Sequence, residues 1–214
     1  MHSILKSLLI FVLLAKAGFA ADFAETKKKA EAGDAGAQYS LAVMYDNGKG
    51  VLKDDEEAVK WYRKAAEQGN SLAQNNLGAM YENGEGVPKD SAEAAKWWRK
   101  AAEQGNANAQ FAIGWMHNIG ALVPQDYAEA VKWYRLAAEQ GHAGALVMLG
   151  AMYRSGSGVP KDLVQAHVWL NIAGANGNEI AKNNLAIVEK EMTSEQKAEA
   201  MKLARELFAK LPRK

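Results

Sequence analysis

Cysteine is missing from all 214 residues of the sequence. Without a thiol, the chain can form no disulfide framework and carry no lipid on an N-terminal cysteine. It also has no thiolate to bind zinc or to act as a nucleophile. The small disulfide-stapled scaffolds and the cysteine-dependent enzymes are therefore excluded.

A long apolar run is also lacking. The run Leu8–Leu14 is much shorter than the roughly 18 residues that span a membrane, and Lys16 follows it closely. A basic residue, Lys6, precedes the run, and Gly18-Phe19-Ala20 supplies the small residues that a signal peptidase reads. We expect residues 1–20 to be a signal peptide, and the mature chain to have no membrane anchor.

The charges show no excess of either sign. The chain has 26 basic and 25 acidic residues, and loss of Lys6 and Lys16 with the signal peptide would leave 24 basic residues. A chain so close to neutral has no global field that attracts nucleic acid. We therefore expect no nucleic-acid partner.

Motifs for catalysis, cofactors or metals are scarce. The four histidines, His2, His117, His142 and His167, stand one per predicted element, without the paired spacing of metal ligands. Gly-x-Gly turns occur, but no Lys-Ser/Thr pair follows them as in a phosphate-binding loop. We predict no catalytic residue, no metal site and no cofactor.

What the sequence does contain is a repeat. Glycines recur every 36 residues without an insertion, at Gly33, Gly69, Gly105, Gly141 and Gly177. An unbroken period of this length predicts a solenoid of stacked helix pairs. The predicted fold is all-α, an α-α superhelix made of antiparallel helix pairs.

The first helix of each repeat carries the pattern Ala-x-x-x-Leu-(Gly/Ala)-x-x-Tyr. Its spacing places the Ala, Leu and Tyr positions on one face, which we predict to be the core. The four copies are Ala37, Leu41 and Tyr45; Ala73, Leu77 and Tyr81; Ala109, Ile113 and His117; Ala145, Leu149 and Tyr153. The small residue after the Leu position predicts close approach of the partner helix, because a glycine inside a helix costs about 1 kcal/mol relative to alanine.

The second helix of each repeat begins with an aspartate that is followed three residues later by Glu or Gln. This pattern predicts capping boxes. The four pairs are Asp54 and Glu57, Asp90 and Glu93, Asp126 and Glu129, and Asp162 and Gln165. Further along, Trp61, Trp97, Trp133 and Trp169 are predicted to fill the core, and Glu56 to pair with Lys60.

The ends of the array differ from its middle. Residues 21–33 read as a polar N-terminal capping helix in which Phe23 packs inward, and 34–192 as four full repeats plus a partial fifth. Residues 193–214 read as a C-terminal capping helix that begins with a capping box at Thr193 and Gln196 and ends near Pro212. Its predicted inward face is Ala198, Met201, Leu203, Ala204, Leu207 and Phe208.

The pattern Ala-x-x-x-Leu-Gly-x-x-Tyr-x-x-Gly-x-Gly-Val-Pro-x-Asp-x-x-x-Ala-x-x-Trp-x-x-x-Ala-Ala-x-x-Gly resembles the Sel-one-like repeat (SLR), a relative of the tetratricopeptide repeat (TPR). The resemblance covers roughly residues 22–191 and implies an adaptor that binds a protein or peptide partner. It also implies a bacterial protein of the periplasm or of the secreted fraction, an envelope regulator or a host-interaction factor. We expect a monomer.

The resemblance to the TPR also implies the binding positions, two residues before and two after the core Leu of each first helix. On this basis the concave face includes Tyr39, Val43, Asn75, Phe111 and Trp115. Phe111 and Trp115 add apolar bulk to the third repeat, and Asn75, Glu82, Asn118 and Arg154 would form a polar rim. The alternative is that Phe111 and Trp115 fill space inside the repeat.

Two hypotheses for function remain from the sequence. The first is an exported, non-enzymatic scaffold that holds a protein or peptide. The alternative is a cell-wall-related hydrolase of the β-lactamase or penicillin-binding type, which cysteine-rich relatives suggest and the lack of cysteine here weakens.

Overall fold

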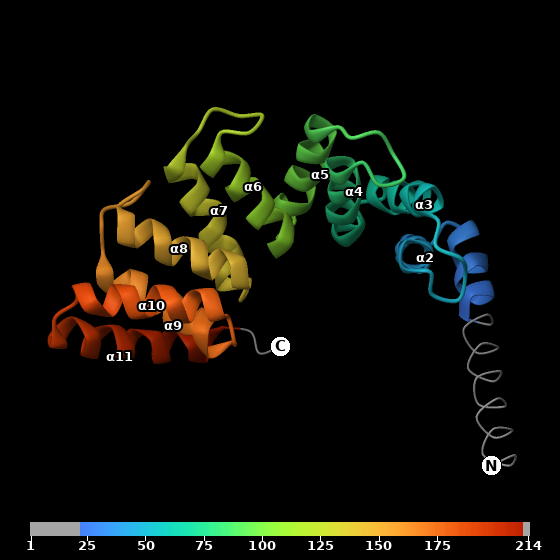
Figure 1. Cartoon of the computed structure of the whole chain (residues 1–214). Coiled ribbons are helices and arrows are strands. Elements are labelled where there is room, and N and C mark those ends of the chain that lie inside the picture. The colour runs from blue at the N-terminus through green and yellow to red at the C-terminus, as the bar shows by residue number, and fades with distance from the viewer. Residues whose placement is uncertain (1–21, 212–214) are drawn as a thin grey trace, which may run out of the picture. The chain divides into compact units, whose positions relative to one another are not determined.

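The computed structural model describes residues 22–211, so the predicted signal peptide and residues 212–214 lie outside the described part. Every regular element in residues 22–211 is an α-helix, as predicted (Figure 1). A helical segment at 22–31 is followed by α2 (Ala35–Asn47), α3 (Asp55–Glu67), α4 (Ser71–Asn83), α5 (Ser91–Glu103), α6 (Ala107–Ile119), α7 (Tyr127–Glu139), α8 (Ala143–Ser155), α9 (Leu163–Ala175), α10 (Glu179–Glu191) and α11 (Ser194–Lys210).

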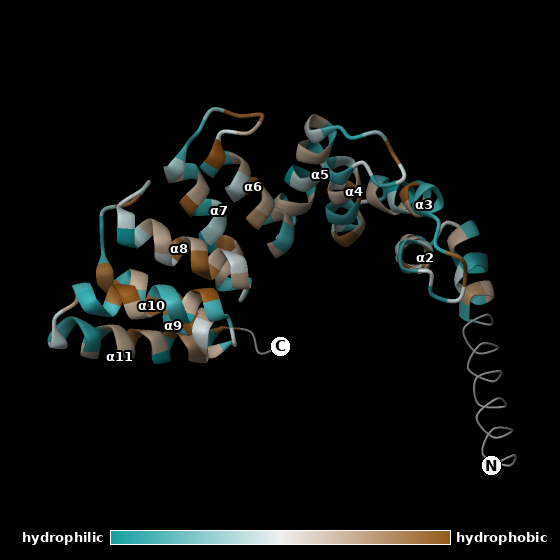
Figure 2. Ribbon diagram, viewed as in Figure 1, coloured by the Kyte–Doolittle hydropathy of each residue, from teal (hydrophilic) through white to brown (hydrophobic). Residues whose placement is uncertain are grey.

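The chain forms two compact units. The first unit ends at Ala101, and the second begins at Ala102. In the first unit α3 packs against both α2 and α4. In the second unit each helix from α6 to α10 packs against the next, and α11 packs against α9. Most helices carry both hydrophobic and hydrophilic residues, so each can face a core and the solvent at once (Figure 2).

The predicted starts of the second helices are correct, but only half of each predicted capping box forms. The side chains of Asp54, Asp90, Asp126 and Asp162 accept a hydrogen bond from the backbone N–H three residues later. The glutamates at that third position bind lysines three residues further on instead. Lys60 therefore binds Glu57, 2.6 Å away, rather than the predicted Glu56. The reciprocal capping box forms at Thr193 and Gln196.

The core of the first helices was predicted correctly at the Ala and Leu positions and only partly at the Tyr position. Tyr153 is buried, whereas Tyr45, Tyr81 and His117 are half-buried. The residue just before the Tyr position is buried in all four repeats, as Met44, Met80, Met116 and Met152. One residue along a helix turns the side chain by about 100°, so at this end of each first helix the methionine is buried more deeply than the residue at the Tyr position.

The small residue after the Leu position makes room for a side chain of the second helix. A Cβ atom on Gly78 would lie 2.7 Å from Cδ1 of Trp98, and one on Gly114 would lie 2.8 Å from Cδ1 of Tyr134. In the fourth repeat, a Cβ atom on Gly150 would lie 2.4 Å from Cγ of Leu170. The predicted close approach is therefore confirmed, and its contact residue follows the tryptophan that we had expected to fill the core.

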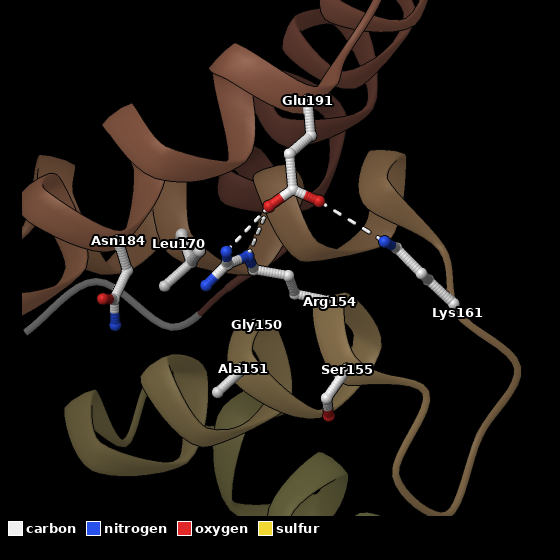
Figure 3. Close-up of a pocket in the computed structure, with 8 residues that line it drawn as sticks. All are labelled: Gly150, Ala151, Arg154, Ser155, Lys161, Leu170, Asn184 and Glu191. Carbon is white, nitrogen blue, oxygen red and sulfur yellow. Dashed lines mark hydrogen bonds and ion pairs between the residues drawn. The ribbon is translucent and has the colours of Figure 1, made fainter.

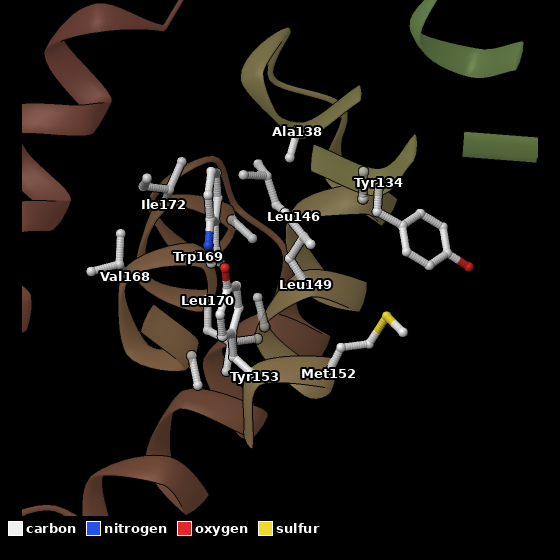
Figure 4. Packing of buried hydrophobic residues seen from close by; sticks show 14 of the residues in the cluster. Tyr134, Ala138, Leu146, Leu149, Met152, Tyr153, Val168, Trp169, Leu170 and Ile172 are labelled. Carbon is white, nitrogen blue, oxygen red and sulfur yellow. The ribbon is translucent and has the colours of Figure 1, made fainter. Parts of the chain in front are cut away.

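The predicted core tryptophans are not equivalent. Trp61, Trp97 and Trp169 are buried, and Trp133 is only half-buried. In the second unit the cluster around Trp169 includes Leu146 and Leu149 of α8 and Ile172 of α9 (Figure 4).

A polar layer lies between successive repeats inside each unit. The side chains of Gln38, Gln74 and Gln110 are buried, and each donates to a backbone carbonyl eight residues earlier. The next repeat adds a second amide, because Gln68 donates to Gln38 at 2.7 Å and Gln140 donates to Gln110 at 2.8 Å. Buried amides with partners on both sides hold the register of neighbouring repeats.

The packing of the two capping helices agrees only in part with the prediction from their sequences. Phe23 lies edge-on against Tyr45, with ring centroids 5.7 Å apart. The inward face of α11 is formed by Ala200, Leu203, Ala204 and Leu207, and α11 ends at Lys210. The predicted face was therefore wrong at Ala198, Met201 and Phe208, which are exposed.

Candidate functional site

The two aromatic residues that we predicted as a binding pair lie on α6 and face different surroundings. The Phe111 ring stacks on the His142 ring at 4.6 Å between centroids and lies 5.5 Å from the Tyr134 ring. Phe111 is half-buried and packs against the core of the second unit. Trp115 is 45% exposed and is left as the accessible member of the pair.

The packing of Phe111 depends on the start of α8. A Cβ atom on Gly144 would lie 3.0 Å from the Phe111 ring, so the glycine leaves space for the aromatic side chain. His142 caps α8 by accepting a hydrogen bond from the backbone N–H of Ala145 through Nδ1, at 3.2 Å. This cap holds the imidazole where it can stack on Phe111.

Trp115 has exposed apolar neighbours along the chain. Ile119 lies one turn further along α6 and is 49% exposed, and Leu122 in the following turn is 57% exposed. The first repeat has Val43, Asn47 and Gly50 at these three positions, so the apolar character belongs to the third repeat.

The other predicted residues of the second unit have partners within that unit. The backbone carbonyl of Asn118 accepts a hydrogen bond from the Gln125 side chain at 2.8 Å. Arg154, near the end of α8, binds the carboxylate of Glu191 at the end of α10, with 2.9 Å from Nε and 2.7 Å from an Nη nitrogen to the same oxygen. Arg154 is therefore committed to an ion pair between two first helices.

In the first unit, Tyr39 and Val43 line a pocket of about 430 Å³ between α2 and the helical segment 22–31. The Tyr39 ring lies 5.9 Å from that of Tyr62, which is part of the core. Asn75 and Glu82 do not line this pocket. The Asn75 carbonyl accepts a hydrogen bond from the Trp98 indole at 3.2 Å, and Glu82 pairs with Lys89 at 3.3 Å.

A second pocket, of about 380 Å³, lies in the second unit between α8, α9 and α10 (Figure 3). Arg154 contributes to its wall, and Lys161 from the turn after α8 binds the other oxygen of Glu191 at 3.3 Å. These two cations lower the pKa of the Glu191 carboxyl, Arg154 through the stronger hydrogen bond and Lys161 through the weaker. The full lining is Gly150, Ala151, Arg154, Ser155, Lys161, Leu170, Asn184 and Glu191.

Sequence reasoning named Arg154 but missed Lys161, Asn184 and Glu191. A signal was present, because the equivalents of Arg154 are Asp46, Glu82 and Asn118, so only the fourth of the full repeats has a cation at this position. Glu191 stands at a position occupied by Asn47, Asn83, Ile119 and Ser155 in the other repeats, and its partner could be found only in the folded structure.

Residues 22–211 contain no group of three or more His, Cys, Asp or Glu side chains arranged to hold a metal ion. No helix in the described part of the chain is long and apolar enough to cross a membrane.

Comparison with known proteins identifies the repeat. The model of the Sel1 repeat matches residues 35–70, 71–106, 107–142 and 143–178, which is more than half of the chain. The chain therefore belongs to the Sel1 repeat family. Proteins of this family are generally protein–protein interaction scaffolds and typically non-enzymatic. No curated protein sequence matches the chain significantly.

Solved structures of similar proteins support the assignment. The chain is 41% identical to a protective antigen with an SLR fold from uropathogenic Escherichia coli, over 86% of this chain and 40% of that one, with a TM-score of 0.80. It is 37% identical to a Sel1 repeat protein from Oxalobacter formigenes, over 82% and 74% of the two chains, with a TM-score of 0.70. An immunity protein from Pseudomonas aeruginosa shares the fold at 21% identity, over 86% and 72%, with a TM-score of 0.52.

Proposed function

We propose that the protein is an exported scaffold that binds a protein or peptide partner on the first-helix face of its repeats, with Trp115 as an anchor. The observation that carries this proposal is that Trp115 is exposed. The other full repeats have the smaller residues Val43, Ala79 and Ala151 at the same position. Tryptophan is among the residue types enriched in binding hot spots, and Ile119 one turn away adds exposed apolar surface beside it. Family membership supports the class of function but not the partner.

The test compares Trp115→Ala with a matched control. Leu136 on α7 is also 45% exposed and lies in the same unit, but on a second helix. Each variant is used to capture proteins from an envelope extract, and captured proteins are then measured against purified variants by titration calorimetry. We expect Trp115→Ala to weaken binding by about 2 kcal/mol or more, and Leu136→Ala to retain the wild-type affinity.

Thermal unfolding of both variants completes this experiment. Because Trp115 is exposed, its truncation should leave the thermal midpoint within about 2 °C of the wild type, the shift that a surface change of a few tenths of a kcal/mol gives. A partner that binds Trp115→Ala and wild type equally would refute Trp115 as the anchor. If alanine substitution of every exposed residue on the first helices left the affinity unchanged, the first helices would not form the binding face.

Export is tested separately, because it depends on residues 1–20, outside the described structure. We propose cleavage after Ala20, which leaves a mature chain that begins at Ala21. Intact-mass measurement of the protein from periplasmic and culture-supernatant fractions should give the mass of residues 21–214. A full-length mass in the cytoplasmic fraction alone would overturn export and leave the binding proposal intact.

A further inference from the structure

The pocket between α8, α9 and α10 holds two cations that share one carboxylate. Arg154 and Lys161 approach the two oxygens of Glu191 from different sides (Figure 3). With two positive charges and one negative charge, the cluster keeps a net positive charge at neutral pH. The other full repeats place an acidic or amide residue at the Arg154 position, so this charge arrangement belongs to the fourth repeat.

The ion pairs are accessible to solvent, so Glu191 can be replaced by another carboxylate. The side chains of Arg154, Lys161 and Glu191 are all partly exposed. Exposed ion pairs of this kind are weak, because water competes for both partners. A guanidinium and a neighbouring lysine can both donate hydrogen bonds to one carboxylate, because each of its two oxygens is an acceptor.

The remaining walls of the pocket suit a short piece of peptide. Gly150 and Ala151 are small, so α8 leaves open space on this side of the pocket, and Leu170 of α9 adds an apolar wall. Leu170 reaches this place because Gly150 lacks the side chain that would collide with it. Asn184 of α10 adds an amide that can both donate to and accept from a peptide backbone.

From this arrangement we propose that Arg154 and Lys161 form a binding site for a peptide carboxylate, which Glu191 occupies as a tethered competitor in the unbound protein. The inference rests on the proposed function and gives its partner a chemical property, a carboxylate at a chain end or on an acidic side chain. The apolar and amide walls bind the residue next to that carboxylate.

Three short peptides test the chemistry directly, by ¹⁵N–¹H NMR titration of the labelled protein. Acetyl-Ala-Leu-Ala with a free carboxyl end presents a terminal carboxylate, and acetyl-Ala-Asp-Ala amide presents a side-chain carboxylate. Acetyl-Ala-Leu-Ala amide has neither. We expect saturable shifts of the amide signals of Arg154, Lys161 and Glu191 with one or both carboxylate peptides and none with the neutral peptide.

Two substitutions then separate the competitor from the receptor. Glu191→Gln keeps the shape of the side chain and removes its charge, so it should tighten binding of the carboxylate peptide about tenfold, the effect of about 1.4 kcal/mol. Arg154→Gln should weaken that binding at least tenfold. Lys132→Gln is the control, because Lys132 forms an ion pair with Glu129 elsewhere in the same unit and should leave the affinity unchanged.

Several outcomes would overturn the inference. Equal binding of the neutral peptide, no tightening in Glu191→Gln, or equal loss in Lys132→Gln would each contradict a carboxylate receptor with a tethered competitor. Stronger shifts with inorganic phosphate than with either carboxylate peptide would assign the cations to phosphate instead. Thermal unfolding of each variant checks that it is folded under the conditions of the titration.

Failure here is distinguishable from failure of the proposed function. A captured partner that depends on Trp115 but not on Arg154 would refute the carboxylate site and retain the scaffold. Peptide binding at Arg154 without any Trp115-dependent partner would retain the carboxylate site and refute the Trp115 anchor.

Discussion

At the scale of single residues, Leu122 departs most clearly from the repeat. It is the one non-glycine residue in the described part of the chain with a positive φ, 63°. The equivalent residues are Gly50, Gly86 and Gly158, with φ values between 65° and 77°. A leucine in this conformation places its Cβ against the following carbonyl, at a cost of about 1–2 kcal/mol. More than half of its side chain is exposed, so little burial offsets the cost.

Leu122→Gly is therefore expected to stabilise the protein by about 1 kcal/mol, after allowance for the greater freedom of glycine in the unfolded chain. Urea unfolding followed by circular dichroism measures the change. Leu52→Gly is the control, because Leu52 is exposed in a turn without a positive φ, and it should stabilise nothing. Equal or lower stability of Leu122→Gly would show that another contact of Leu122 outweighs its backbone strain.

At the scale of elements, neighbouring repeats are joined by buried amides as well as apolar contacts. The Gln110 amide donates to the Ala102 carbonyl at 3.2 Å, and its oxygen accepts from Gln140 at 2.8 Å. In the following repeat Leu146 stands at the position of Gln110 and is completely buried. The same site on a first helix therefore works either as a hydrogen-bonded amide or as a hydrocarbon, depending on the groups that face it.

This difference predicts unequal effects of two substitutions at Gln110. Gln110→Ala removes both hydrogen bonds and leaves a cavity, so we expect a loss of about 2–3 kcal/mol. Gln110→Leu fills the space and should cost about 1 kcal/mol, since Gln140 still donates to the Gly105 carbonyl and Ala102 still accepts from the Gly105 N–H. Urea unfolding of both variants measures the values. Equal losses would mean that volume does not matter at this site.

At the scale of the whole molecule, the ionisable groups set a pH range of greatest stability. The pKa values of Glu129 and Glu191 are lowered, mainly by hydrogen bonds from Lys132 and Arg154. Their contribution is present above the ordinary carboxyl pKa of 4.5 and is lost as the pH falls through the lower folded values. Burial raises the pKa of Tyr62 and Tyr134 above the ordinary value of 10.0. Their contribution is present below pH 10 and is lost as the pH rises above it.

We therefore expect a plateau of stability between about pH 5 and pH 10. At pH 11 the unfolding free energy should be lower than at pH 7 by about 1–3 kcal/mol, because the two tyrosines ionise in the unfolded chain. Urea unfolding across this range tests the profile. Tyr134→Phe removes one of the two groups and should reduce the alkaline loss by about half, and an unchanged alkaline loss would contradict the assignment to the tyrosines.

The fold could be predicted from the sequence because the same local signals for helices and turns occur in four successive repeats. The 36-residue period, the aspartates before the second helices and the glycines behind Leu77, Ile113 and Leu149 each set a helix or a close contact through residues near in sequence. The inward face of a helix was harder to predict, because apolar residues occur on both sides of the first helices and of α11. Burial of Met44 and exposure of Met201 were decided by which neighbouring helix lies opposite.

The candidate site is formed by departures from the repeat, and there the sequence could point only to positions. It determined that the third repeat carries extra apolar bulk and that the fourth carries Arg154 in place of an acidic or amide residue. The tertiary structure decided that Phe111 packs against His142 while Trp115 stays exposed, and that Arg154 meets Glu191. The physical reason is that helix periodicity is set by neighbours along the chain, whereas these contacts join side chains of different repeats.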